Sequence, residues 1–161
     1  ELQELTTDVR GFEAPVSMHP GAVQQRFIDE MKAAAVNDLA PAVAEVIVGT
    51  EQPYLQVVFD TRIPAMADGR VAIVGDAAFA ARPHAAAGSA KAAADAWALY
   101  EHLGSHDGGI AEALKLWEPG QLALGNQLVD RVSAMGARSQ FSNTWAPGDP
   151  DLRFGLYGPG K

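Results

Sequence analysis

The sequence has 161 residues, 48% of them hydrophobic, with 20 acidic residues against 12 lysines and arginines and a formal net charge of −8. This length suffices for one domain with a buried core, while the negative charge argues against nucleic acid or an anionic membrane surface as a partner. Without cysteine, and without an apolar run near the roughly 20 residues that a membrane span needs, the protein is expected to be cytoplasmic and free of disulfides, thiolate metal sites and cysteine nucleophiles.

The beginning of the chain predicts an extended segment followed by a helix. Residues 1–16 contain short apolar pairs separated by Gly11 and Pro15, which favours an extended arm or edge strand. A helix is predicted to enter at residues 17–20, with Pro20 in its first turn, and to run to about residue 35. Its apolar residues recur every four positions, at Val23, Phe27 and Met31.

A second short helix and a strand are predicted next. The helix opens at Pro41 and ends near Gly49. Its buried face is expected to carry Val43, Val46 and Ile47. Residues 54–60 then alternate with a period of two, which predicts a strand with one face on a core. The opposite face would carry Tyr54, Gln56, Val58 and Asp60.

The stretch from Gly69 to Leu103, GRVAIVGDAAFAARPHAAAGSAKAAADAWALYEHL, carries the strongest functional signals. Its residues 71–74 predict a strand buried on both faces, as in a parallel sheet. Gly75 ends this strand, and Asp76 places a carboxylate at the carboxyl edge, where open α/β sheets bind ligands. The Ala-rich helix that follows Gly88 directs free N–H groups toward the same edge. These features predict one site for a hydroxyl-rich, partly anionic ligand.

The rest of the chain predicts long helices and an irregular tail. The Ala-rich helix over residues 85–103 is apolar around much of its girth, so Trp97 is expected to be enclosed. Lys91 and Asp95 are four residues apart and are expected to pair across one turn. A further helix begins at residue 110, and Pro119 is expected to kink or restart it.

Two small residues and several aromatic ones are singled out near the C-terminus. Gly125 and Gly136 are expected to permit close approach of backbone to the last predicted helix. The tail from residue 142 is rich in Gly, Pro and Asp and cannot be regular. It is nevertheless expected to be pinned to a surface by three aromatic side chains: Trp145, Phe154 and Tyr157.

Residues 75–99 carry the pattern G-D-A-A-x(4)-P-x(4)-G-x(6)-D-A-x-x-L. It resembles the second flavin-binding motif of the FAD-dependent aromatic hydroxylases, which have the p-hydroxybenzoate hydroxylase fold. With L-R-F-G-L-Y-G-P-G at residues 152–160, the chain is most similar to the 2,6-dihydroxypyridine 3-hydroxylase group of that family. The resemblance implies an α/β fold, with the C-terminal portion of a Rossmann-like FAD-binding domain, part of a substrate-domain sheet and long C-terminal helices.

The resemblance also implies an order of domains. Residues 1–64 would form part of the substrate-binding domain, residues 65–104 the strand, loop and helix of the second FAD-binding motif, and residues 105–161 the C-terminal helices and tail. The sequence has no initiator methionine and no G-x-G-x-x-G after a predicted strand. We therefore expect an incomplete part of a longer enzyme, whose N-terminal half in the same or another chain is a partner. A homodimer is also possible.

The implied cofactor is FAD, with NADH or NADPH and O₂ as co-substrates and a small aromatic ring as substrate. The resemblance assigns FAD contacts, with Asp76 accepting hydrogen bonds from ribityl hydroxyls, to six positions: Gly75, Asp76, Pro83, Ala87, Gly88 and Ser89. Two residues depart from the family pattern, because Phe79 replaces a frequent His and Lys91 a frequent Asn. The flavin-edge contacts of those side chains are therefore not transferred.

Four residues are candidates for contact with the substrate. His84 is the candidate base for a ring hydroxyl, because histidine side chains titrate near neutrality, and its alternative role is a loop hydrogen bond. Arg82 could meet an anionic substrate or NADH phosphate, or form a surface ion pair. Tyr54 and Gln56 could reach a substrate, or could lie on a solvated sheet face. No metal site is predicted.

The predicted function is that of a part of a flavin-dependent monooxygenase. Its substrate would be a small hydroxylated aromatic or N-heteroaromatic ring, similar to 2,6-dihydroxypyridine. The alternative is a non-catalytic fragment or assembly domain that keeps the fold but does not bind FAD alone.

Overall fold

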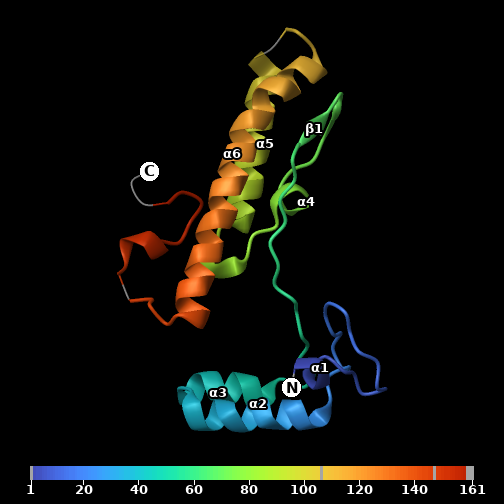
Figure 1. The fold of residues 1–161 in the computed structure, drawn as a ribbon, viewed down its shortest axis with the longest axis vertical. Coiled ribbons are helices and arrows are strands. Elements are labelled where there is room, and N and C mark those ends of the chain that lie inside the picture. Colours follow the sequence, from blue (N-terminus) through green and yellow to red (C-terminus); the bar gives the residue numbers. More distant parts are fainter. Residues whose placement is uncertain (1, 106, 147, 159–161) are drawn as a thin grey trace. The chain divides into compact units, whose positions relative to one another are not determined.

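The computed structural model describes residues 2–105, 107–146 and 148–158 (Figure 1). The chain divides into two compact units, Glu1–Val58 and Phe59–Lys161. The helices of the first unit are α1 Leu2–Leu5, α2 Gln25–Asp38 and α3 Pro41–Gly49. The elements of the second unit are β1 Ala67–Asp68, β2 Val71–Ala72, α4 Asp76–Phe79, η1 Pro83–Ala85, α5 Gly88–Ser105, α6 Ile110–Gly136, η2 Ala137–Phe141 and η3 Pro150–Leu152. No helix among these residues is long and apolar enough to cross a membrane.

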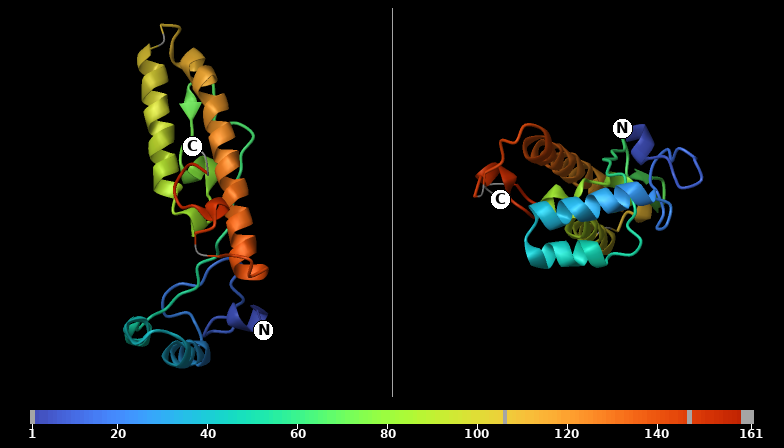
Figure 2. Two further views of the ribbon diagram at one scale, coloured as in Figure 1. Left: turned by 90° about the vertical axis from the view of Figure 1, so that its left-hand side faces the viewer. Right: turned by 90° about the horizontal axis from the view of Figure 1, so that it is seen from below.

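In the first unit, α2 and α3 lie side by side, joined by a short connection (Figures 1 and 2). The predicted start of α3 at Pro41 is confirmed, but α2 begins at Gln25, so the prediction of a helix from residue 17 is wrong. Met18 is instead extended, because its N–H and C=O both pair with Leu55, at 2.9 and 3.3 Å. The expected arm over residues 1–16 contains α1 and an isolated bridge between Thr7 and Glu13.

The buried faces of these two helices are formed by fewer and smaller residues than the pattern predicted. α2 buries Ile28 and Ala35, and α3 buries Ala44, whereas Val46 is 70% exposed. The predicted face of α3 is therefore wrong, since the small side chain of Ala44 is the one that turns inward. Such a residue permits close approach of two helix backbones.

Residues 54–60 do not form the predicted strand. A strand needs a neighbour that satisfies its alternate N–H and C=O groups, and the described residues offer only the single bridge between Leu55 and Met18. Beyond that bridge the chain is extended without a ladder. Tyr54 and Gln56 are exposed, as the solvated alternative proposed.

The second unit is built on two long antiparallel helices, α5 and α6, which lie side by side in both ribbon views (Figures 1 and 2). The β1–β2 hairpin and α4 pack against them and complete a core of six buried residues: Met66, Ala78, Phe79, Leu114, Trp117 and Val129. A second cluster joins η1 to the end of α6 and the tail: Ala85, Ala87, Leu128, Val132, Met135 and Leu152.

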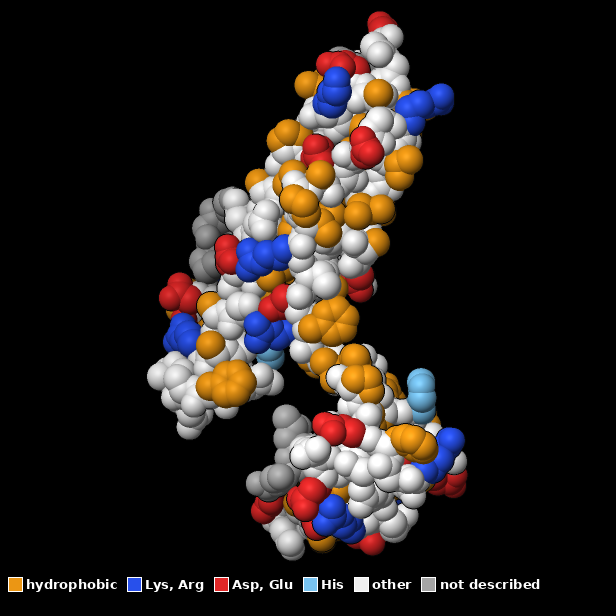
Figure 3. Space-filling view, turned by 45° about the vertical axis from the view of Figure 1, so that its right-hand side comes forward, with side chains coloured by type: hydrophobic (Ala, Val, Ile, Leu, Met, Phe, Trp, Pro, Cys, Tyr) orange, Lys and Arg blue, Asp and Glu red, His pale blue; other side chains and the backbone are white. Residues whose placement is uncertain are grey.

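Residues 71–74 do not form a strand buried on both faces. β2 pairs only with β1, in antiparallel register, and Val71 is 68% exposed. The turn at Gly69, whose φ of +57° favours glycine, folds the chain back into a hairpin. The described part of the chain is thus mixed α/β and rich in helix, with a small two-stranded sheet in place of a parallel one. Apolar side chains remain exposed on the surface of this unit (Figure 3).

Helix α6 runs without interruption through Pro119, so the prediction of a restart at this residue is wrong. A proline in a helix removes one backbone hydrogen bond and crowds the preceding turn. The turn is held from both sides by its neighbours, because Trp117 is buried and the Glu118 carboxylate accepts N–H bonds from Met66 and Ala67 at 2.6 and 2.9 Å. These contacts offset the lost hydrogen bond.

The tail is pinned as predicted, but by different residues. The three aromatic side chains proposed for this role are 49–72% exposed. Leu152 is buried instead, and the Arg131 guanidinium of α6 donates hydrogen bonds to the carbonyls of four tail residues: Arg153, Gly155, Leu156 and Tyr157. The Gly155 N–H also donates to the Ala85 carbonyl at 2.7 Å, which ties the tail to the loop before α5.

Candidate functional site

The site begins at the turn that ends the hairpin. Gly75 has φ +60°, a conformation that favours glycine, and a Cβ there would lie 3.1 Å from the Cβ of Ala92. Its N–H donates to the Asp95 carboxylate at 2.9 Å, and its carbonyl accepts bonds from Ala78 and Phe79 that start α4. The turn is therefore fixed by contacts on every side.

The predicted meeting of an acid and a helix N-terminus is present in the structure. Asp76 follows the turn, is exposed, and accepts no hydrogen bond from the described residues. A Cβ on Gly88 would lie 3.8 Å from Asp76 Oδ1, so the carboxylate stands beside the first residue of α5. The N–H groups of the first α5 turn, at Gly88, Ser89 and Ala90, have no acceptor among the described residues. These donors and the Asp76 acceptor open on the same region.

The loop between α4 and α5 is rigidly held. η1 begins at Pro83, and Ala86 then adopts the left-handed region at φ +51°. Ala85 and Ala87 are buried, so neither methyl group is exposed to a ligand. Pro83 is exposed.

His84 lies beneath the end of α6. A Cβ on Gly136 would be 2.5 Å from His84 Nε2, so this glycine permits a close approach, but of a side chain and not of backbone as predicted. Gly125 does the same for the Phe79 ring, which a Cβ would meet at 2.4 Å. His84 Nε2 is buried without a hydrogen-bond partner in the described chain. The imidazole also borders an open apolar groove of about 400 Å³ that includes Met135 and Trp145.

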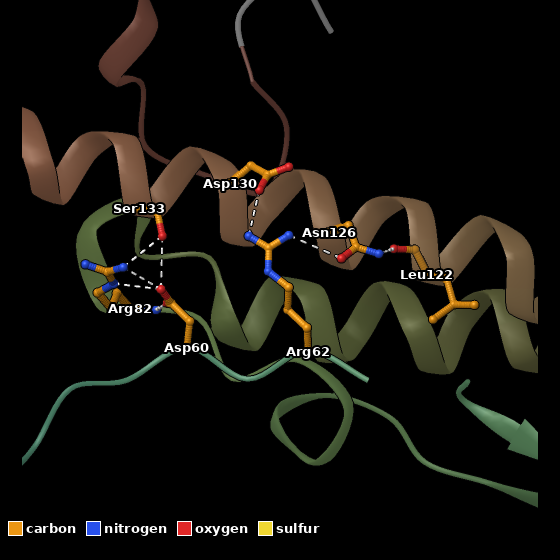
Figure 4. Close-up of polar contacts among 7 residues, drawn as sticks. All are labelled: Asp60, Arg62, Arg82, Leu122, Asn126, Asp130 and Ser133. Atoms are coloured by element: carbon orange, nitrogen blue, oxygen red, sulfur yellow. Dashed lines mark hydrogen bonds and ion pairs between the residues drawn. The ribbon is translucent and has the colours of Figure 1, made fainter. Parts of the chain in front are cut away.

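Arg82 makes the ion pair that was its alternative role, and its partner is Asp60 (Figure 4). Its Nε donates to Asp60 Oδ2 at 2.8 Å, and its Nη2 donates to the Ser133 hydroxyl at 2.8 Å. Ser133 in turn donates to Asp60 at 3.0 Å. Partial burial alone would raise the pKa of Asp60, but the hydrogen bonds from Arg82 and Ser133 outweigh it and hold that pKa below its usual value. The network joins the start of the second unit to α6.

The Asp60 network predicts a pH-dependent contribution to stability. Asp60→Asn should lower the free energy of unfolding at pH 7 by about 1–2 kcal/mol. Because the folded-state pKa lies below 3.8, this contribution is present above that pH and is lost as the pH falls through the folded-state value. Urea unfolding at pH 7 and near pH 3 should therefore show the difference between wild type and variant shrinking in acid.

The control is Asp130→Asn, because Asp130 pairs with Arg62 in a similar way but is 71% exposed (Figure 4). Exposed pairs contribute little, so we expect a change below about 0.5 kcal/mol at either pH. Equal effects of the two substitutions would mean that the Asp60 network has no special role.

Tyr54 and Gln56 belong to the first unit, whereas Asp76, Arg82 and His84 belong to the second. Tyr54 borders an apolar pocket of about 230 Å³ that also includes Val23 and Phe27. Gln56 is exposed, and its side-chain amide donates a long hydrogen bond, of 3.4 Å, to the Val57 carbonyl. Their contact with a substrate stays a prediction.

The structure contains a buried polar pair, Lys91 and Asp95, whose contact the sequence predicted but whose burial it did not. The pair between Lys91 and Asp95 is confirmed, at 2.5 Å, but both side chains are buried, with 1% and 0% exposure. Lys91 Nζ also lies 5.3 Å from the centre of the Phe79 ring. The two residues that depart from the family pattern, Phe79 and Lys91, are therefore neighbours in the structure. Trp97 is 65% exposed, and the prediction that it is enclosed is therefore wrong. α5 turns its polar pair inward instead.

Comparisons with known proteins place this geometry in a family context. Residues 1–60 match the model of the FAD binding domain-like family. The chain is 36% identical over 157 residues to 2,6-dihydroxypyridine 3-monooxygenase of Paenarthrobacter nicotinovorans, a match that covers 97% of this chain and 39% of that protein. The chain is a homologue of part of this monooxygenase. The predicted resemblance is confirmed.

Solved structures agree with this relationship. The 2,6-dihydroxypyridine-3-hydroxylase of Arthrobacter nicotinovorans superposes with a TM-score of 0.82 and 34% identity, over 100% of this chain and 40% of that one. HpxO of Klebsiella pneumoniae, solved with FAD and uric acid, superposes over 73% of this chain and 31% of that one, with a TM-score of 0.60. At 22% identity it shows the fold alone. The chain spans about two fifths of the length of the 2,6-dihydroxypyridine hydroxylases.

Proposed function

We propose that the chain is part of a flavin-dependent monooxygenase that acts on a small hydroxylated aromatic or N-heteroaromatic ring of the 2,6-dihydroxypyridine type. The observation that carries this proposal is the exposed Asp76 carboxylate beside the first turn of α5. The homology to a 2,6-dihydroxypyridine 3-monooxygenase supports the choice of ring. NADH or NADPH would be the electron donor, and O₂ the oxidant.

The residues at this site fit the riboflavin part of FAD. Asp76 offers a carboxylate that accepts no hydrogen bond within the described chain, which suits the ribityl hydroxyls. The N–H groups of Gly88, Ser89 and Ala90 offer donors without an acceptor, and the helix dipole favours negative charge on the ring edge that faces them. Gly88 carries no side chain that would crowd the Asp76 carboxylate, whereas Gly75 is buried and its missing side chain makes room for Ala92. The pyrophosphate-binding loop would come from a part of the protein outside this sequence.

When bound, FAD supplies the redox chemistry, and the protein supplies binding, orientation and electrostatics. The N-terminus of α5 would stabilise negative charge on the ring edge that faces it. His84 would accept a proton from the ring hydroxyl of the substrate, which makes the ring a better nucleophile. Because Nε2 faces Gly136, Nδ1 is the nitrogen left for this role.

The exposed apolar hairpin supports a partner for this chain. Val71 is 68% exposed, and Ile73 and Val74 are more than a third exposed. Exposed apolar side chains grouped within a few residues are typical of a surface that another part of a protein covers. We propose that the remainder of the enzyme, in the same or another chain, covers it.

The test is the FAD affinity of the full-length protein with and without Asp76. Asp76→Ala should weaken FAD binding by about 1.5–3 kcal/mol, roughly 10–150-fold, because the ribityl hydroxyls lose a charged acceptor. Asp68→Ala is the control, since Asp68 is an exposed acid in the hairpin that precedes Asp76. Titration is followed by flavin fluorescence.

Two outcomes contradict the proposal in different ways. Equal affinity of wild type and Asp76→Ala removes Asp76 from the site. A colourless wild-type protein that cannot be reconstituted with FAD favours the alternative, a non-catalytic or assembly domain that keeps the fold.

A further inference from the structure

The buried pair on α5 contacts the flavin-binding turn directly. Asp95 Oδ2 accepts the Gly75 N–H at 2.9 Å, and its other oxygen lies 2.5 Å from Lys91 Nζ. Both side chains are inaccessible to solvent, so neither can contact a ligand. The carboxylate has two separate partners, a backbone amide of the turn and a buried ammonium.

The contacts of α5 with the turn lie along one stripe of the helix. Gly88, Ala92 and Asp95 follow each other at intervals of four and three residues, which places them on the same face. Gly88 lies beside the Asp76 carboxylate, the Ala92 methyl group lies where a Cβ of Gly75 would point, and the Asp95 carboxylate accepts the Gly75 N–H. This stripe therefore sets the position of the turn relative to the helix N-terminus.

The Gly75 N–H has no other hydrogen-bond acceptor among the described residues. A strand in a sheet gives its N–H groups to a neighbouring backbone, but the Gly75 N–H bonds to a side chain. A buried amide without an acceptor is unfavourable, so the turn depends on Asp95. Asp95 in turn depends on Lys91, because a buried carboxylate needs a counter-charge. The Phe79 ring covers the Lys91 ammonium at 5.3 Å and closes the cluster.

We propose that Asp95 is a positioning residue for the flavin site. By holding the Gly75 amide it places the Asp76 carboxylate beside the N-terminus of α5, and Lys91 supplies the counter-charge that allows Asp95 to be buried there. This inference rests on the proposed function. It gives a role to Lys91, which stands where the resembled family frequently has Asn: the Lys91 ammonium balances the charge of the carboxylate that holds the Gly75 turn.

The test compares two double variants of the full-length protein that both remove the buried charges. In Lys91→Met/Asp95→Asn the side-chain oxygen that accepts the Gly75 N–H remains, whereas in Lys91→Met/Asp95→Leu it is lost. The first should bind FAD within about threefold of wild type. The second should bind at least roughly tenfold more weakly, the effect of an unsatisfied buried amide. Urea midpoints of the apo proteins report stability separately.

Each outcome decides between a positioning role and a merely structural one. Loss of stability in both variants with equal FAD affinities overturns the positioning role. Where the Leu variant does not fold, Asp95→Glu replaces it, because it keeps the pair with Lys91 but displaces the acceptor from Gly75. Weaker FAD binding at a near wild-type urea midpoint supports the proposal, and unchanged binding overturns it. A wild-type protein that binds no FAD overturns the proposed function, and this inference with it.

Discussion

Replacing Trp117 with alanine should lower the free energy of unfolding by about 3–5 kcal/mol, the cost of removing a large buried aromatic side chain. Trp117 is 1% exposed and lies in the core cluster between α6 and α4. Its indole N–H also donates to the Asp95 backbone carbonyl at 3.1 Å, so the substitution removes a bond between the two long helices. Urea denaturation followed by circular dichroism measures the change.

Trp97→Ala is the matched control on the neighbouring helix. Trp97 is 65% exposed, and its contacts are a bond to Glu101 and a tilted ring contact with Tyr100, 5.9 Å between centroids. Surface substitutions of this kind usually change stability by less than about 0.5 kcal/mol. Similar losses for both tryptophans would contradict the packing of α5 and α6 described above.

The His84→Asn variant should hydroxylate its substrate about 10²–10⁴ times more slowly, the usual range for loss of a general base. FAD should still bind, because Asp76 and the α5 N-terminus do not depend on the imidazole. Oxidation of NADH or NADPH should continue without hydroxylated product, and the pH–rate profile should lose the limb that reports protonation of the base. Stopped-flow assays at several pH values measure these effects.

His102→Asn is the control, because His102 lies near the end of α5 and its Nδ1 is 2.7 Å from the Ala98 carbonyl. Its hydroxylation rate should match wild type. If His84→Asn also matches wild type and keeps the pH limb, His84 serves the structure of the loop. Its Nε2 contact with Gly136 would then be its main role.

Local signals predicted those elements that depend on residues close in sequence. Pro41 marked the start of α3 correctly, since proline suits the first turn of any helix. Two predictions failed because they required neighbours in space. The segment over residues 54–60 forms only the single bridge from Leu55 to Met18 among the described residues, and α6 continues through Pro119, where distant contacts hold the turn.

The same distinction applies to the site. Asp76 and Gly88 lie close together as predicted, although the parallel strand on which that prediction rested is a short antiparallel hairpin in the structure. The pairing of Arg82 with Asp60, 22 residues away, has no local signal, and neither does the burial of Lys91 and Asp95. A polar pair four residues apart on an Ala-rich helix looks the same in sequence whether solvent or a glycine turn lies opposite.

The most direct test of the central claim, that the Asp76 turn and the N-terminus of α5 hold a flavin, is a crystal structure of the full-length protein with FAD. We predict ribityl hydroxyls within about 3.2 Å of the Asp76 carboxylate. We also predict the flavin edge facing the N–H groups of Gly88, Ser89 and Ala90. A flavin bound elsewhere, with Asp76 facing solvent and those N–H groups bound to water, would contradict the account.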